Sequence, residues 1–222
     1  MPNNTTAVAL AVRVHPRGGA PSGDDRAVAA LKGAASAAVS GDPELLSGPS
    51  SVTADGVLLL HLSDPGRVLD AVLAVASALR PLASTYCGAI DDGDGGDGGG
   101  HVESALIAGE AAASMALHGI ESTDAKERRV CLLTPDPDPV VSALAGMVLA
   151  TYDAMTERQR QIISLTRSSD TQQQVATHLD VTRQAVNQSL AAAGWPHLRR
   201  AEEEIRRHLE SCARSPEAVI GR

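Results

Sequence analysis

The chain has 222 residues, a formal net charge of −8 and 43% hydrophobic residues, yet aromatic residues make up only 1% of it. This length fits one large domain or two small ones, and no apolar run approaches the roughly 20 residues of a membrane-spanning helix. Three irregularly spaced cysteines exclude a disulfide framework and a zinc quartet, and the start MPNNTTAV lacks the features of a signal peptide. We therefore expect a cytoplasmic protein with no membrane partner.

The first 138 residues alternate between strand-like and helix-like segments. An apolar, Val-rich run over 7–14 predicts a buried strand, and a helix is expected over 24–39. Residues 51–62 predict a hairpin around Ala54-Asp55-Gly56. Later segments predict a helix over 66–82, a strand over 84–90, a helix over 104–118, a strand over 129–134, and a helix from about Val140 after the extended segment PDPDP. This order predicts an α+β sandwich with helices on one face of a small mixed sheet.

Residues 91–100, DDGDGGDGGG, predict a flexible acidic loop. Asp92, Asp94 and Glu103 would occupy the first, third and twelfth places of a calcium loop, but Gly96 and Asp97 reverse the required ligand-then-glycine order. The histidines are scattered, without a pair one helical turn apart beside a cysteine. No Walker lysine loop or convincing nucleophile triad is present either. We therefore expect no metal site, no cofactor and no catalytic residue.

Residues 171–193, TQQQVATHLDVTRQAVNQSLAAA, predict a helix-turn-helix. Two apolar pairs, each spaced by one helical turn, give each helix one buried stripe, and the full ladder is Val175, Ala176, Leu179, Val181, Val186 and Leu190. Asp180 is expected to adopt the left-handed backbone of the turn. Thr182 is a suitable N-cap for the second helix, and Thr171 or Asp170 for the first.

The outward side chains of the second helix are those that hydrogen-bond base edges in a major groove: Arg183, Gln184, Asn187 and Gln188. Phosphate contacts, or contacts that fix the approach to DNA, are expected from Thr171, Gln172, Gln173 and Thr182, and further phosphate contacts from Arg199 and Arg200. An ordinary helical hairpin with a polar surface is the alternative. The excess of Gln, Asn and Arg over Glu and Lys favours DNA binding.

The flanking sequence completes a helical domain. Thr156-Glu157-Arg158-Gln159 predicts a capping box that opens a helix with Ile162, Ile163 and Leu165 on its buried face. After Gly194, a C-cap candidate, an amphipathic helix is expected over about 197–211. Its apolar stripe, Leu198, Ile205 and Leu209, would close over the core or pair with a second copy of the chain. Its arginines would reach phosphates or form ion pairs on a solvated face, with Glu202, Glu203 and Glu204 diluting their field.

Charge is unevenly distributed along the chain. Residues 1–150 hold 9 Lys and Arg against 18 Asp and Glu, a net charge of −9, whereas residues 151–222 hold 10 against 9, a net charge of +1. Between residues 156 and 200 the count is 6 against 3. The surplus of positive charge therefore coincides with the helix-turn-helix. Because it is modest, binding to double-stranded DNA should depend on dimerisation and fall steeply with salt.

Four segments of the N-terminal part carry a resemblance to a known family: ALAVRV, TADGVLLL, STYCGAIDDG and ALIAGEAAASMALHG. Together with the C-terminal motif they resemble the SatD family, whose N-terminal part is similar to the nucleotidyl-cyclase and GGDEF palm. The resemblance implies a ferredoxin-like palm sandwich followed by an all-α helix-turn-helix domain. The expected domains are a degenerate palm over 1–138, a connecting helix over 139–155 and a DNA-binding domain over 156–214.

The palm's two divalent cations are held by carboxylates at the end of the first strand and at the hairpin. Here the first strand ends Val12-Arg13-Val14-His15-Pro16, and the hairpin offers only Asp55, which we interpret as a turn residue. The leading hypothesis is a homodimeric transcription regulator with a non-catalytic N-terminal domain that senses an unknown small molecule or dimerises. The alternatives are a helix-turn-helix that contacts protein, as in a sigma factor or antirepressor, and a nucleotide-cyclase-like enzyme, which the missing carboxylates disfavour.

Overall fold

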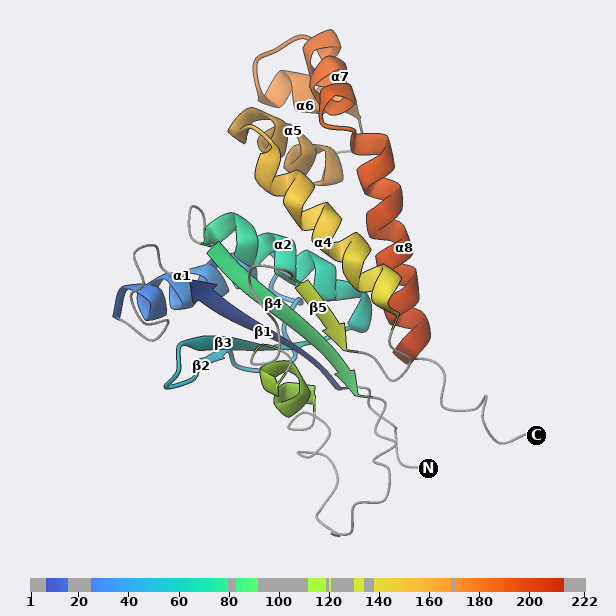
Figure 1. Ribbon diagram of the computed structural model, residues 1–222. Coiled ribbons are helices and arrows are strands. Elements are labelled where there is room, and N and C mark those ends of the chain that lie inside the picture. The colour runs from blue at the N-terminus through green and yellow to red at the C-terminus, as the bar shows by residue number, and fades with distance from the viewer. Residues whose placement is uncertain are drawn as a thin grey trace, which may run out of the picture. The chain divides into compact units, whose positions relative to one another are not determined.

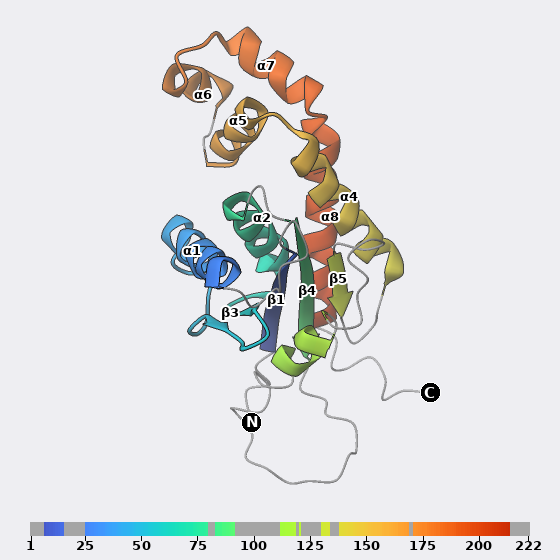
Figure 2. The same cartoon turned by 60° about the vertical axis from the view of Figure 1, so that its left-hand side comes forward.

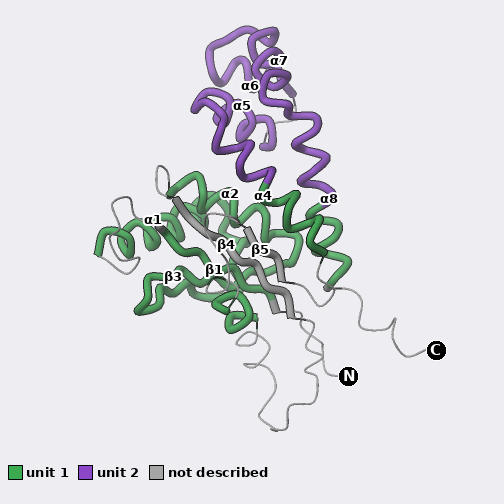
Figure 3. Tube along the Cα trace, viewed as in Figure 1, with its two compact units in different colours: residues 1–146, 205–222 green, residues 147–204 purple. Residues whose placement is uncertain are grey.

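The computed structural model describes residues 7–15, 25–79, 83–91, 112–118, 120, 130–133, 138–168 and 171–213. Tertiary contacts divide the chain into two compact units (Figure 3). Unit 1 comprises residues 1–146 and 205–222, and unit 2 comprises residues 147–204. Unit 1 is α+β and unit 2 is helical. The SatD-like boundaries and the palm assignment stay predictions.

Unit 1 is built on a five-stranded mixed sheet (Figure 1). Its strands lie in the order β2 (Ser51–Val52), β3 (Val57–Leu62), β1 (Ala7–His15), β4 (Ala83–Asp91) and β5 (Val130–Leu133). The central strand β1 pairs antiparallel with both β3 and β4, whereas β4 and β5 are parallel. The apolar run predicted to be a strand is therefore the centre of the sheet.

Both faces of the sheet are covered, because successive side chains of a strand point to opposite sides. Ala9 and Ala11 of β1, with Val57 and Leu59 of β3, pack against helical residues 112–118 and 120 in one buried cluster. The alternate residues of the two strands are also buried, and they are Val8, Leu10, Val12, Val14, Leu58, Leu60 and Leu62. Helices α1 (Asp25–Gly41) and α2 (Val68–Ala78) contact the strands on that second face.

Helices on two faces correct the expectation of a sandwich with helices on one face. The sequence predicts a helix over 104–118, and that prediction does not say on which face of the sheet the helix lies. Ala9 and Ala11 are small, and they face Ala112, Ala113 and Ala116 across the interface. Small residues on both sides let the helix backbone approach the sheet closely.

Local sequence signals account for the connections between these elements. The hairpin turn closes with a hydrogen bond from the Gly56 amide to the Thr53 carbonyl, and Gly56 adopts a left-handed backbone at a φ of 71°. Asp55 lies in this turn and is exposed. Asp64 accepts a hydrogen bond from the Gly66 amide at 2.7 Å and so caps η1 (Pro65–Arg67), which leads into α2.

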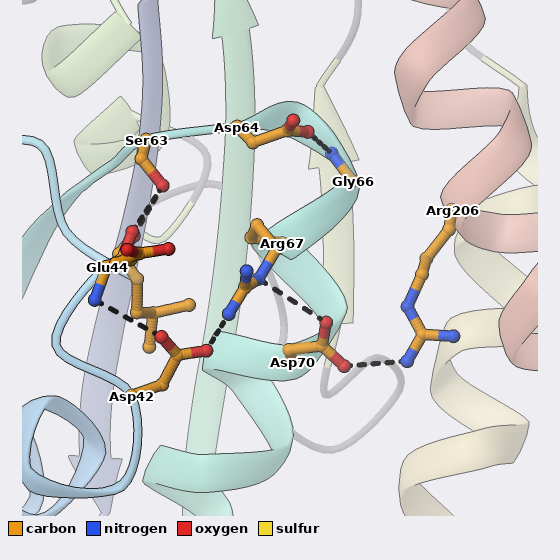
Figure 4. Close-up of polar contacts among 9 residues, drawn as sticks. Asp42, Glu44, Ser63, Asp64, Gly66, Arg67, Asp70 and Arg206 are labelled. Carbon is orange, nitrogen blue, oxygen red and sulfur yellow. Dashed lines mark hydrogen bonds and ion pairs between the residues drawn. The ribbon is translucent and has the colours of Figure 1, made fainter. Parts of the chain in front are cut away.

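Charged side chains tie the last turns of α8 (Trp195–Ala213) to α2 within unit 1 (Figure 4). Arg206 contacts Asp70 at 2.6 Å, and Arg67 contacts Asp42 and Asp70. These side chains are all about one-third exposed, so solvent screens each pair. The cluster positions the end of the helix more than it stabilises the fold.

Several sequence predictions lie outside the described residues. They are the acidic loop, together with the calcium-loop positions Asp92, Asp94, Gly96, Asp97 and Glu103, and most of the PDPDP segment. The predicted helix over 104–118 is described only from residue 112. The predicted helix over 66–82 is shorter than expected, because α2 ends at Ala78. None of the described helices has the length and apolarity needed to cross a bilayer.

The packing of Ala112, Ala113 and Ala116 against the sheet predicts a strong dependence on side-chain size. Replacing the fully buried Ala116 by Leu should lower the free energy of unfolding by about 1–3 kcal/mol, because the interface has no space for three more carbons. Ser114→Leu, an exposed position in the same helix, is the matched control and should change it by less than about 0.5 kcal/mol. Urea unfolding of the full chain measures both, and equal effects would contradict this packing. The helix that carries both positions is the yellow-green one in Figure 2.

Candidate nucleic-acid interface

Three helices of unit 2 form the predicted helix-turn-helix and the helix before it: α5 (Glu157–Ser168), α6 (Gln172–His178) and α7 (Arg183–Ala192). Their core consists of the predicted apolar residues, with Ile162, Ile163, Val175, Ala176, Val186 and Leu190 all buried. Leu165, Leu179 and Val181 are half-buried rather than enclosed. The apolar ladder is thus confirmed in both helices, and only its two residues beside the turn, Leu179 and Val181, are half-buried.

Both predicted N-terminal caps of α5 and α6 form reciprocal hydrogen bonds. The Gln159 amide donates to Thr156 Oγ1 at 3.2 Å, and the Thr156 amide donates to Gln159 Oε1 at 2.9 Å. Thr171 and Gln174 repeat the same arrangement at the start of α6. Thr171, rather than Asp170, is therefore the N-cap of α6.

The turn between α6 and α7 depends on Asp180. Its φ of 52° places it in the left-handed region that few side chains tolerate. The Val181 amide donates to the Ala176 carbonyl at 3.0 Å, and the Arg158 guanidinium donates to the Leu179 carbonyl at 3.2 Å. The contact from Arg158 was not predicted, because a sequence does not show which backbone carbonyl a long side chain reaches.

Helix α7 begins at its predicted cap, where the Ala185 amide donates to Thr182 Oγ1 at 3.1 Å. Its buried side carries Val186 and Leu190. The opposite side exposes the four predicted base-reading residues, Arg183, Gln184, Asn187 and Gln188. Within the described part of the chain, none of these four side chains makes a hydrogen bond or ion pair. One helix face therefore holds one guanidinium and three amides with no intramolecular partner.

The other predicted contact residues differ in how they are placed. The hydroxyls of Thr171 and Thr182 serve as caps, so they fix the helix starts. Gln173 is exposed, whereas Gln172 is half-buried at the first turn of α6. Arg199 and Arg200 are exposed on α8.

Gln172 and the two arginines border the same groove of unit 2. This groove has a volume of about 430 Å³ and is lined by Thr166, Gln172, Leu190, Trp195, Pro196, Arg199, Arg200 and Glu203. Arg199 contacts Glu203 at 3.0 Å, an exposed pair one helical turn apart. The ion pairs predicted for the exposed face of α8 are therefore present at Arg199 and Glu203. Within the described residues, Arg200 makes no ion pair.

Helix α8 begins earlier than predicted. Gly194 has a φ of 65° and follows the C-cap of α7, and α8 starts directly at Trp195 instead of about His197. Pro196 is tolerated there because the first amides of a helix have no intrahelical acceptor. Since α8 follows α7 after two residues, no strand pair stands between them.

The predicted apolar stripe of α8 is buried within the chain itself. Leu198 lies in unit 2, and Ile205 and Leu209 lie in unit 1. Of the two alternatives, closing over the helical core holds for Leu198 alone, because Ile205 and Leu209 are buried in unit 1 instead. This stripe therefore offers no surface to a second copy.

Glu202 does not dilute the field of the neighbouring arginines as expected. It is only 1% exposed, and its carboxylate contacts Arg167 at 2.5 Å and accepts a hydrogen bond from the Tyr152 hydroxyl at 2.8 Å. Arg167 also donates to the Tyr152 hydroxyl at 2.6 Å. Helices α4 (Pro139–Ala154), α5 and α8 therefore meet at one buried carboxylate.

Aromatic rings surround the arginine of this network. The Arg167 guanidinium lies 5.5 Å from the Tyr152 ring centre and 5.6 Å from that of Trp195. Burial raises the pKa of Tyr152 far above its usual value, the Arg167 charge opposes that rise, and Glu202 adds to it. Sequence reasoning missed this network. One signal was visible, because two of the three aromatic residues of the chain are Tyr152 and Trp195.

Comparison with protein families supports the assignment of the motif. Residues 153–193 match the family described as "Sigma-70, region 4", a helix-turn-helix DNA-binding region. The match covers α5, α6 and α7 and no part of unit 1. The chain therefore contains a helix-turn-helix DNA-binding module. No curated protein and no solved structure matches the chain. Among the described residues, no three potential metal ligands lie together.

The buried network predicts a large loss of stability when one partner is removed. Arg167→Ala leaves Glu202 buried without its counter-charge and should lower the free energy of unfolding by about 3 kcal/mol. Adding Glu202→Gln to that variant should restore part of the loss, because a neutral amide costs less to bury. Arg199→Ala, which breaks an exposed pair, is the control and should cost at most about 0.5 kcal/mol. Thermal unfolding that ranks the two arginine variants equally would contradict this role.

Proposed function

We propose that the chain is a sequence-specific DNA-binding protein that regulates transcription as a homodimer, with α7 as its recognition helix. The observation that carries the proposal is the exposed face of α7, where one arginine and three amides have no partner in the described part of the chain. A helix face that only contacts solvent does not require this set of amide side chains. Arg pairs with guanine and Asn or Gln with adenine through two hydrogen bonds each.

The remaining contacts would fix the position of α7 on the duplex. Gln173 is exposed at the start of α6, and Arg199 and Arg200 are exposed near the start of α8. Such side chains reach phosphates without reading sequence. With few cations near the motif, one copy would bind weakly, so two copies on adjacent half-sites would supply the affinity. Half-sites would then lie about 34 Å apart, or a multiple of that distance.

The N-terminal domain is proposed to be a palm-like, ferredoxin-like sandwich without catalytic activity. The strand order supports it, because β1 and β3 each lie between two strands that a helix connects. Loss of catalysis is supported by Arg13 near the end of β1 and by the exposed turn position of Asp55. One carboxylate does not hold two divalent cations. Sensing of an unidentified small molecule, or dimerisation, is the role left for such a domain.

A second candidate function is a protein-interaction module of the sigma-factor or antirepressor kind. The match to Sigma-70, region 4, favours it, and the acidic residues 1–150 would compete with DNA for a basic partner. The salt dependence of duplex binding distinguishes the two functions. Affinity for a duplex falls steeply between about 50 and 200 mM salt when phosphates are neutralised. A shallow salt dependence with weak duplex binding would favour the interaction module.

Substitutions on α7 test the leading proposal. Arg183→Ala or Asn187→Ala should each weaken binding to a duplex selected from a random library by about 1–3 kcal/mol and relax base preference at one position. Gel shifts with the selected duplex and its single-base variants measure both effects. Arg26→Ala, an exposed arginine of α1 with the same change of charge, is the matched control and should bind like the wild type. If both α7 variants also bind like the wild type, α7 does not read DNA.

Catalysis is tested directly on the purified chain. Incubation with ATP or GTP and Mg²⁺ should yield no cyclic nucleotide and no cyclic or linear dinucleotide above a protein-free blank, because the cation carboxylates are missing. Mass spectrometry of the reaction mixture detects these products. Product that disappears in an Asp55→Asn variant would establish an enzyme instead.

A further inference from the structure

The turn between α6 and α7 joins the helix proposed to contact phosphates to the helix proposed to read bases. It contains Asp180, whose left-handed backbone at a φ of 52° costs free energy in a residue with a side chain. Such a conformation persists only where the surrounding contacts hold it in place. One of these contacts lies within the turn itself, where the Val181 amide donates back to the Ala176 carbonyl at 3.0 Å.

A second contact reaches the turn from outside, from Arg158 in the first turn of α5. Its Nη2 atom donates to the Leu179 carbonyl at 3.2 Å, and its Nη1 atom donates to Gln161 Oε1 at 3.0 Å. Leu179 is the C-cap of α6, and the last carbonyls of a helix carry partial negative charge that favours a nearby cation. Gln161 holds the other end of the guanidinium, so it orients Arg158 toward that carbonyl.

We propose that Arg158 is a positioning residue of the DNA interface. It holds the Leu179 carbonyl and thereby fixes the angle between α6 and α7, without touching the duplex itself. Among the described residues, Arg158 makes no ion pair and no hydrogen bond other than these two, so its charge acts on the turn alone. This inference rests on the proposed function, because it assigns a further residue to the same site.

The angle between the two helices matters because base readout requires accurate geometry. Hydrogen bonds weaken steeply when donor and acceptor are misaligned, so the amides of α7 read bases only while the phosphate contacts hold the helix in register. A turn that has lost one constraint must be ordered when DNA binds, and that ordering opposes association. Binding to DNA of arbitrary sequence depends on phosphate charge and does not require this alignment. Loss of the constraint should therefore weaken binding to a matched sequence selectively.

Binding measurements on two duplexes distinguish a positioning role from a direct phosphate contact. Arg158→Ala should lower affinity for a duplex selected from a random library about 10-fold, the scale of one charge-assisted hydrogen bond at an exposed place. Affinity for a duplex of arbitrary sequence should fall by less than about 3-fold, and the slope of log affinity against log salt should not change. Equal losses on both duplexes, with a slope lower by about 0.9, would show a phosphate contact and overturn the proposal.

Three further variants separate positioning from a general loss of stability. Gln161→Ala removes the group that orients Arg158 without changing the charge, and should lower affinity for the selected duplex about 3-fold. Arg158→Lys keeps the charge and one donor, so it should recover part of the loss. Arg160→Ala is the matched control, because this guanidinium of the same helix donates to the Met155 carbonyl at the end of α4 and not to the turn. It should leave the ratio of the two affinities unchanged, and a ratio changed as much as by Arg158→Ala would overturn the proposal.

Amide hydrogen exchange of the full chain tests the same role without DNA. In Arg158→Ala the Val181 amide should exchange about 10-fold faster, because the turn opens locally. The Ala193 amide, which donates to the Ser189 carbonyl at 3.0 Å at the other end of α7, should exchange as in the wild type. Unchanged exchange at Val181, or equal acceleration at both amides, would overturn the positioning role. Faster exchange at Val181 alone, in a protein that binds no duplex, would instead refute the proposed function and leave the contact of Arg158 with the turn standing.

Discussion

A single buried carboxylate organises the DNA-binding unit. Glu202 has lost nearly all contact with water, and Tyr152 and Arg167 replace that water with a hydrogen bond and a charge. Because an unpaired buried charge is costly, the three helices that carry these residues have one favourable arrangement at this point. Arg167 also lies over the ring of Trp195, which starts α8 directly after the turn that ends α7. The angle at which the chain leaves α7 is thereby tied to α5.

Short-range sequence signals predicted most of the structure of this unit. The caps at Thr156, Thr171 and Thr182, the left-handed Asp180 and the buried ladder all follow from short-range spacing that the sequence displays openly. Glu202 was misjudged because it lies in a run of three glutamates, where spacing alone suggests a solvated face. Its burial depends on Arg167, which is 35 residues away, and a single sequence does not report such a pairing.

The same limit applied to the sheet. Alternation and turn residues predicted the strands, including the hairpin at Gly56, because these signals lie within a few residues of each other. They did not predict that both faces would carry helices. That outcome depends on small side chains such as Ala9 and Ala116 meeting across the interface, and small residues are equally common on faces exposed to solvent. The start of α8 was placed two residues late for a related reason, since Pro196 was read as outside the helix instead of within its first turn.

Helix α7 carries a single cation, Arg183, among its outward side chains, and the neighbouring Thr182 hydroxyl accepts a hydrogen bond from the Ala185 amide. A DNA-binding protein whose recognition helix neutralises few phosphates stays only briefly on double-stranded DNA of arbitrary sequence. Its discrimination would then come from amide groups that form good hydrogen bonds with matching bases alone. The protein would therefore stay longer at matched sequences of a chromosome, and little of it would be bound to other sequences.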